Sequence, residues 1–150
     1  MRIHSILKSV AIVSVLGVIA SCGGSDSSST SGGEISKADF VERANAFCTS
    51  LSEKLANAQA DLGSSPTEEQ ISGFMTDALV AEYRLTIGDI RNLGFPAGDE
   101  SLLDGILSDA EKVLDEINSD PVAVLSAAET PFADVNAGFQ DYGLTVCAET

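Results

Sequence analysis

The chain of 150 residues is 44% hydrophobic and carries 23 acidic against 8 basic side chains, a formal net charge of −15 at pH 7. Its length predicts one domain with a modest core. Because a surface this acidic repels phosphate backbones and anionic headgroups, nucleic acid and anionic lipid are excluded as partners of the folded part.

Residues 1–21 have the parts of an export signal. Arg2 and Lys8 give a positive start, and an uncharged, mostly aliphatic run of thirteen residues follows from Ser9 to Ser21. A membrane-spanning helix needs ~20 residues of this kind. We therefore expect a cleaved signal peptide rather than a permanent transmembrane anchor.

The end of this signal, “IASC” from Ile19 to Cys22, resembles the bacterial lipobox, in which an aliphatic residue and two small ones precede a cysteine. The resemblance implies that the Cys22 thiol receives a diacylglycerol and that cleavage makes Cys22 the first mature residue. Two acyl chains anchor a protein stably, so the mature protein is expected at the cell membrane, on its extracytoplasmic face. The alternative is an ordinary secretory signal that is cut near Cys22.

Residues 22–34 contain the expected lipid attachment and the run “GGSDSSSTSGG”. Gly and Ser cannot form a core, so we predict a flexible tether with a reach of roughly 20 Å. Removal of residues 1–21 also removes His4, the only histidine, and leaves six basic against 23 acidic side chains, a charge of −17. Without an imidazole, Ser-His-Asp catalysis, Cys-His catalysis and histidine-ligated zinc are excluded.

Residues 35–150 are predicted to form an all-α domain, a small four-helix bundle, because no stretch alternates with period two for long enough to be a strand. The first helix spans 36–62: Ser36 and Asp39 are spaced as a capping box, and Gly63 ends it. Its apolar residues recur three and four positions apart, as in the seam of a bundle: Val41, Ala44, Cys48, Leu51, Leu55, Ala58 and Leu62.

The second helix is predicted to start with Ser65 as N-cap and to end near Asn92, before the break at Gly94 and Pro96. Glu68, three residues after Ser65, would complete a second capping box. The following apolar residues are expected to face the core: Ile71, Phe74, Met75, Ala78, Leu85, Ile90 and Leu93.

The third helix is predicted from Gly98 or Asp99 to Ser119. The fourth begins at Asp120-Pro121, a cap followed by proline at the first helical position, and ends at Gly143. Thr130-Pro131 repeats that signal, so the fourth helix is expected to be kinked or split near Pro131. Apolar residues recur at helical spacing along the third helix: Leu102, Leu103, Ile106, Leu107, Ala110, Val113, Leu114 and Ile117.

Two cysteines remain once Cys22 is assigned to the lipid. An exported chain with two remaining cysteines most simply pairs them, so we expect a Cys48–Cys147 disulfide that ties the first helix to the tail. The alternative is a pair of buried free thiols. Asn45, beside the apolar seam, either hydrogen-bonds the C-terminal tail or faces water.

The stretches “ADFVERANAFC” and “DYGLTVC”, together with “IRNLGFP” between them, resemble the paired signatures of small, uncharacterised actinobacterial lipoproteins and secreted proteins. The similarity covers roughly residues 36–148. It implies export, a helical domain and the Cys48–Cys147 bond, and it supplies no catalytic residues.

Adjacent carboxylates are frequent, but neighbours on a helix point about 100° apart and do not converge on one substrate atom. Pairs such as Glu68/Glu69 and Asp115/Glu116 are therefore interpreted as capping and solubilising residues. A glycosidase-like acid pair that forms only in the tertiary structure stays open. Residues 134–141, “DVNAGFQD”, place oxygen ligands two apart but lack the ligand pattern of an EF-hand loop, so no metal site is predicted.

The leading hypothesis is a non-enzymatic, lipid-tethered helical module outside the cell membrane that binds an envelope protein or a small ligand. No catalytic residue, metal or cofactor is assigned, and the membrane contact is expected through the lipid on Cys22. A hydrolase that uses carboxylates alone and a purely structural envelope component are the alternatives.

Overall fold

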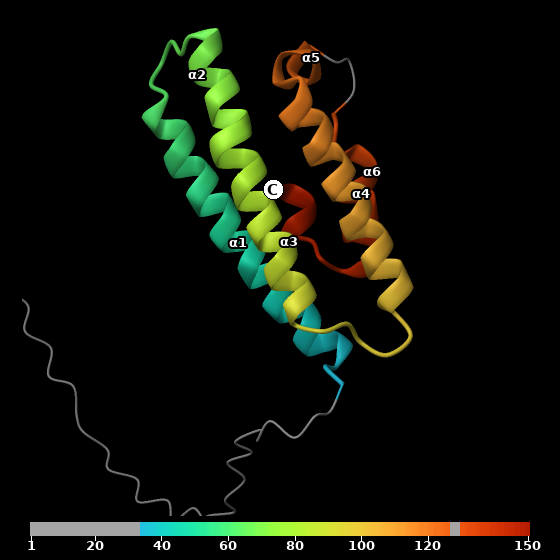
Figure 1. The fold of residues 1–150 in the computed structure, drawn as a ribbon. Coiled ribbons are helices and arrows are strands. Elements are labelled where there is room, and N and C mark those ends of the chain that lie inside the picture. Colours follow the sequence, from blue (N-terminus) through green and yellow to red (C-terminus); the bar gives the residue numbers. More distant parts are fainter. Residues whose placement is uncertain (1–33, 127–129) are drawn as a thin grey trace, which may run out of the picture. The chain divides into compact units, whose positions relative to one another are not determined.

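The computed structural model describes residues 34–126 and 130–150. Within these residues the chain forms helices and no strand (Figure 1), which confirms the all-α prediction. The expected signal peptide, the expected tether up to residue 33 and the expected lipid attachment at Cys22 lie outside the described residues.

The first helix, α1 (Lys37–Asp61), agrees closely with its prediction. Ser36 is the N-cap, and its Oγ accepts a hydrogen bond from the Asp39 backbone N–H at 3.1 Å. The Asp39 carboxylate accepts from the Ser36 hydroxyl at 2.6 Å rather than from its backbone N–H, so the box is only half formed. Gly63 follows the helix with φ of 73°, a left-handed conformation that favours glycine.

The second predicted helix is one continuous rod of three segments: α2 (Glu68–Gly73), the π-helix η1 (Phe74–Val80) and α3 (Ala81–Asn92). The expected start at Ser65 is wrong. Thr67 is the N-cap, because Thr67 and Gln70 form both reciprocal bonds of a capping box, at 3.3 and 2.9 Å.

The π-helical segment changes which residues of the rod face the core. Backbone hydrogen bonds in a π-helix run from i to i+5, so Met75 and Val80, five residues apart, are both buried. A π-helical turn contains about one residue more than an α-helical turn, so the residues of α3 are rotated about the helix axis relative to an uninterrupted α-helix. As a result, Thr86 and Ile87 are buried. Leu85, expected to face inward, is 61% exposed because the prediction assumed an uninterrupted α-helical period.

The helix α4 (Glu100–Ser119) begins after Asp99, as predicted. Its core face is also as expected, except that Leu102 is 56% exposed. This residue lies one position from the fully buried Leu103, and neighbours on a helix point about 100° apart. The buried residues of α4 are Leu103, Leu107, Ala110, Leu114 and Ile117.

The predicted fourth helix is split into α5 (Pro121–Ser126) and α6 (Ala133–Tyr142). Asp120 caps α5, since its Oδ1 accepts from the Ala123 backbone N–H at 2.9 Å. Thr130-Pro131 instead belongs to the turn before α6, whose N-cap position, Phe132, makes no side-chain capping bond. The split near Pro131 is therefore confirmed, and the expected cap by Thr130 is wrong.

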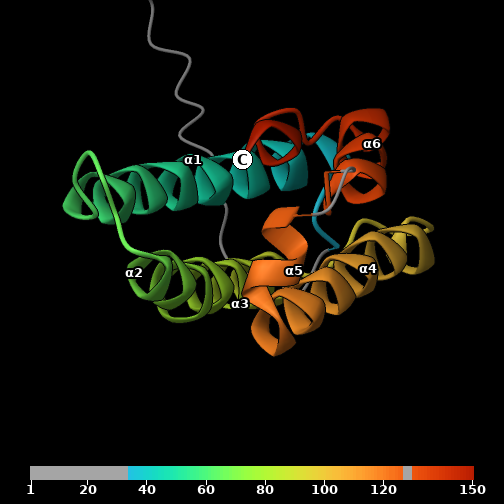
Figure 2. The ribbon, with the colours of Figure 1, turned by 90° about the horizontal axis from the view of Figure 1, so that it is seen from above.

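The helices run up and down in two layers (Figures 1 and 2). One layer contains α1, α6 and the C-terminal 3-10 helix η2 (Cys147–Glu149), and the other contains α2, η1, α3 and α4. Gly138 allows α6 to approach α4 closely, because a Cβ there would lie 3.1 Å from Ile106 Cγ1. The core between the layers has these largest fully buried side chains: Phe40, Ile90, Leu103, Leu107, Leu114, Ile117 and Leu144.

Candidate functional site

The C-terminal tail is fastened to the middle of α1 by a covalent bond. Cys48 and Cys147 form a disulfide with Cα atoms 5.0 Å apart, across 99 sequence positions. The predicted pairing is confirmed, and the alternative of free thiols does not apply. Both residues belong to the hydrophobic core, so the tail is held on the inner face of α1.

Asn45 adds two hydrogen bonds to this attachment. Its Oδ1 accepts from the Val146 backbone N–H at 3.1 Å, and its Nδ2 donates to the Gly143 carbonyl at 3.4 Å. Asn45 precedes Cys48 by three residues, and helical neighbours three apart lie on the same face. The bond from Asn45 to the tail, one of its two predicted roles, is therefore confirmed. We call Asn45, Cys48 and the tail residues 143–147 the C-terminal clasp.

A small cavity of about 20 Å³ lies beside the disulfide. This is room for about one water molecule. The aromatic rings of Tyr83 and Phe132 are part of its lining and stack with centroids 5.2 Å apart. Its other lining residues are Cys48, Leu51, Thr86, Ile87, Ile90, Ala110, Val135, Asn136, Phe139, Cys147 and Thr150. None of these residues is a carboxylate, so the cavity has no carboxylate pair.

A larger, open depression of about 310 Å³ lies between α1 and η1, which we call the α1–η1 groove. Glu149 is the only charged residue in its lining and is exposed. The side chain of Ser52 joins that of Thr150 by a 3.1 Å hydrogen bond at the end of the groove nearest η2. The full lining is Ser52, Leu55, Ala56, Gln59, Phe74, Leu79, Glu149 and Thr150.

The structure does not bring the adjacent carboxylate pairs of the sequence together as a site. Glu68 and Glu69 lie in the first turn of α2 and are exposed, as expected of residues that complement a helix dipole. Asp115 pairs with Arg84 of α3 at 2.6 Å, and Glu116 is exposed. Among the described residues, none of the carboxylate side chains is fully buried.

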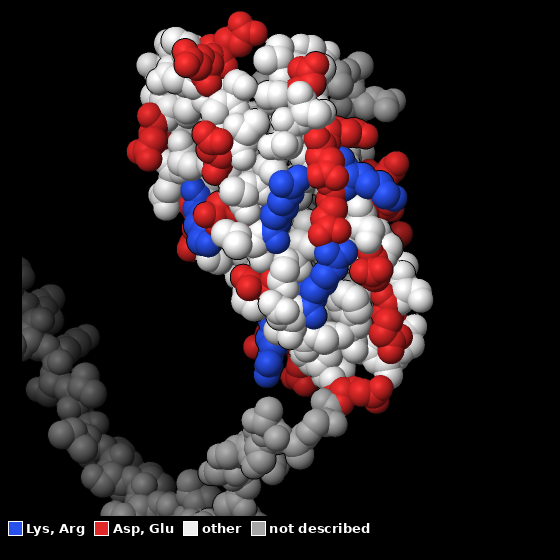
Figure 3. Space-filling view, viewed as in Figure 1, with Lys and Arg blue, Asp and Glu red and all other residues white. Residues whose placement is uncertain are grey.

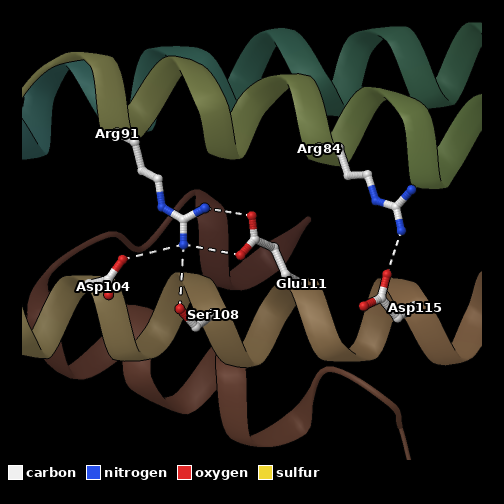
Figure 4. Close-up of polar contacts among 6 residues, drawn as sticks. All are labelled: Arg84, Arg91, Asp104, Ser108, Glu111 and Asp115. Carbon is white, nitrogen blue, oxygen red and sulfur yellow. Dashed lines mark hydrogen bonds and ion pairs between the residues drawn. The ribbon is translucent and has the colours of Figure 1, made fainter.

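The polar contacts between α3 and α4 are structural (Figure 4). Arg91 donates to both oxygens of Glu111 and also contacts Asp104 and Ser108. The hydrogen bond to Glu111 is the main cause of the raised pKa of Arg91. Because its donors are shared among partners on α4, Arg91 is committed to the helix pair rather than presented to a ligand.

A second polar cluster lies at the end of the domain where α1 begins. The Tyr142 hydroxyl donates to Asp99 Oδ2 at 2.7 Å, and Lys37 Nζ lies 3.9 Å from the same oxygen. Lys37 Nζ also lies 4.0 Å from the centroid of the Tyr142 ring. These contacts join the start of α1, the start of α4 and the end of α6, which gives the cluster a structural role.

The two tyrosines are expected to ionise only at unusually high pH. Burial raises the pKa of Tyr83 to about 12, and burial with the Asp99 hydrogen bond raises the pKa of Tyr142. Above pH ~10 the unfolded chain loses these protons while the folded chain keeps them, so stability falls as the pH rises from there. Tyrosinate absorbance reports this directly, since the chain has two Tyr and no Trp.

Titration in denaturant is the control for this prediction, and both phenols should then ionise near pH ~10. Tyr83→Phe and Tyr142→Phe assign the two steps. A folded protein in which both phenols ionise near their ordinary pKa would contradict the burial and the Asp99 contact.

Residues 134–141, the stretch compared with an EF-hand loop, lie within α6. Val135 and Phe139 are buried on its inner face, whereas Asp134 and Asp141 are exposed. Across residues 34–126 and 130–150, no group of three His, Cys, Asp or Glu residues is placed to hold a metal ion. In the same ranges, none of the helices combines the length and the hydropathy that crossing a membrane requires.

Sequence reasoning missed the α1–η1 groove. Of its lining residues on α1, only Leu55 belongs to the predicted apolar seam. The π-helix that contributes Phe74 and Leu79 has no recognisable sequence signal. Comparison with known proteins found no matching family model, no matching curated protein and no matching solved structure.

Proposed function

We propose that the protein is a lipid-anchored, extracytoplasmic binding module without catalytic activity. The observation that carries this proposal is the α1–η1 groove, whose volume of about 310 Å³ is at the lower end of the range for ligand sites. Apolar and neutral polar side chains line it, with one carboxylate, Glu149. Such a lining suits recognition of an apolar surface, and the hydroxyls of Ser52 and Thr150 are hydrogen-bonded to each other rather than to Glu149.

A hydrolase that uses carboxylates alone is less well supported. Glycoside hydrolysis needs two carboxyl groups that flank one bond, about 5–10 Å apart. The cavity beside the disulfide has no carboxylate in its lining, and the groove has one. A purely structural envelope component would have the same anchor, but such a role does not require an open groove in its surface.

The anchoring half of the proposal rests on the lipobox-like end of the signal at Cys22. Cys22→Ala is expected to release the protein from membranes or to leave an uncleaved precursor. The reason is that residues 1–34 contain no other cysteine to which the lipid could be attached. Fractionation of cells with and without detergent, combined with intact mass, measures both outcomes.

The matched control is Ser25→Ala, which changes a tether residue and should leave lipidation and membrane association intact. A Cys22→Ala protein that is still cleaved at the same bond and still needs detergent for its release would show that Cys22 does not hold the anchor.

A further inference from the structure

Partly exposed apolar side chains on both walls of the α1–η1 groove are left in contact with water. Leu55 of α1 lines the groove together with Phe74 and Leu79 of η1, and all three are only partly buried. Next to them, α2 has no buried residue. The upper end of the α1–α2 pair (Figure 1) is therefore not covered by a third helix from the described residues.

The π-helix creates one wall of the groove. Phe74 and Leu79 are five residues apart, and in a regular α-helix that spacing points side chains roughly 140° away from each other. Winding with i to i+5 bonds brings both side chains to the same side. Turns of this kind are rare and are found frequently at functional sites. The groove is thus built by an uncommon backbone geometry rather than left by imperfect packing.

The lining of the groove contains one carboxylate, Glu149, and no basic residue. Neither residues 55–83 nor residues 113–150 contain a Lys or Arg. Lys54, the basic residue nearest to the groove in sequence, binds Glu82 of α3 at 2.8 Å. In the view of Figure 3, acidic side chains alone mark the upper end of the domain. Five of the six basic residues outside the signal pair with carboxylates of this chain: Lys37, Lys54, Arg84, Arg91 and Lys112.

We propose that the α1–η1 groove binds a positively charged amphipathic helix of a partner protein. The apolar side of that helix packs between α1 and η1, and its Lys or Arg side chains meet Glu149 and the acidic upper end. This inference rests on the proposed function and names the chemistry of its partner. A helix in a groove is the matching mode, since the described residues offer no sheet edge to an extended peptide. A second copy is opposed by its own acidic charge.

The test uses the full chain, reconstituted in phosphatidylcholine vesicles, and a fluorescent amphipathic leucine–lysine helical peptide as the probe. Protein-free vesicles give the baseline for fluorescence anisotropy. We expect saturable binding that weakens with salt, and no binding of a matched leucine–glutamate peptide. If Cys22 has no lipid, the same titration is done on the soluble protein, so this proposal and the anchoring proposal fail separately.

Two neighbouring lysine substitutions on α1 separate the groove from overall charge. Ala56 lines the groove and Asn57 does not, and both are exposed, so neither change disturbs the core. Ala56→Lys is expected to weaken peptide binding about tenfold, since it fills the groove and repels the cationic probe. Asn57→Lys adds the same charge and should change the affinity by no more than about twofold.

Three results would overturn the proposal. Equal weakening by Ala56→Lys and Asn57→Lys would mean that net charge, not the groove, attracts the peptide. Equal binding of the leucine–glutamate peptide would remove the requirement for positive charge. Self-association of the wild-type protein that Ala56→Lys abolishes, measured by chemical crosslinking of the same samples, would assign the groove to a second copy.

Discussion

Reduction of the Cys48–Cys147 disulfide is expected to lower the free energy of unfolding by about 2–5 kcal/mol. The bond closes a loop with a sequence separation of 99, and the chain-entropy model assigns about 4.7 kcal/mol to a loop of roughly this length. Cys48 and Cys147 are 3% and 4% exposed, so in the folded protein the bond is shielded from reductant. Once it is broken, the hydrogen bonds of Asn45 are left to hold the tail.

Urea unfolding with and without reductant measures this effect, in a Cys22→Ala background so that no third thiol is present. The Cys48→Ala/Cys147→Ala double variant is the control and should match the reduced protein whether or not reductant is added. Intact mass after alkylation reports the bond independently. Two alkylatable thiols in the folded, oxidised protein would contradict the clasp.

Phe40→Ala is expected to lower the free energy of unfolding by about 3–5 kcal/mol. The Phe40 side chain is 0% exposed and meets two aromatic rings edge-on. Its centroid lies 6.0 Å from that of Phe95 and 6.0 Å from that of Tyr142. Truncation leaves a cavity where α1, the turn before α4 and the end of α6 converge, and it removes both aromatic contacts.

Two further variants are the controls for the size of this effect. Phe40→Leu keeps most of the volume and should cost about 1–2 kcal/mol. Phe47→Ala removes the same side chain from a partly buried position on the same helix, so it should cost less than Phe40→Ala. If the two alanine variants unfold at the same urea concentration, the prediction that Phe40 contributes more to the stability of the core than Phe47 is wrong.

Local signals in the sequence were sufficient for most of the fold. Caps at Ser36 and Asp120 and the glycines after α1 and α6 mark helix ends through short-range contacts, so they could be predicted residue by residue. The disulfide could be predicted because, once Cys22 is assigned to the lipid, the two other cysteines have only one way to pair. Asn45 was placed beside the seam by the same helical period that placed Cys48.

The errors arise where one segment depends on the rest of the fold. Leu85 was assigned to the core because helical periodicity was continued through the π-helix, and that winding has no signature in its amino acids. The groove depends on the distance between α1 and η1 and on the position of Glu149, far away in sequence. Period and composition describe one element at a time, so a surface shared by three elements could not be predicted.

The position of the disulfide has a consequence for proteolysis. The bond joins residue 48 to residue 147, so every helix from α2 to α6 lies within the loop that it closes. A protease that cuts once in this loop separates no part of the domain, because the two pieces stay covalently connected. The core contacts of both pieces then remain intramolecular, and the domain can reassemble without a search between separate molecules. A second cut in the loop is needed before any fragment of the loop can diffuse away.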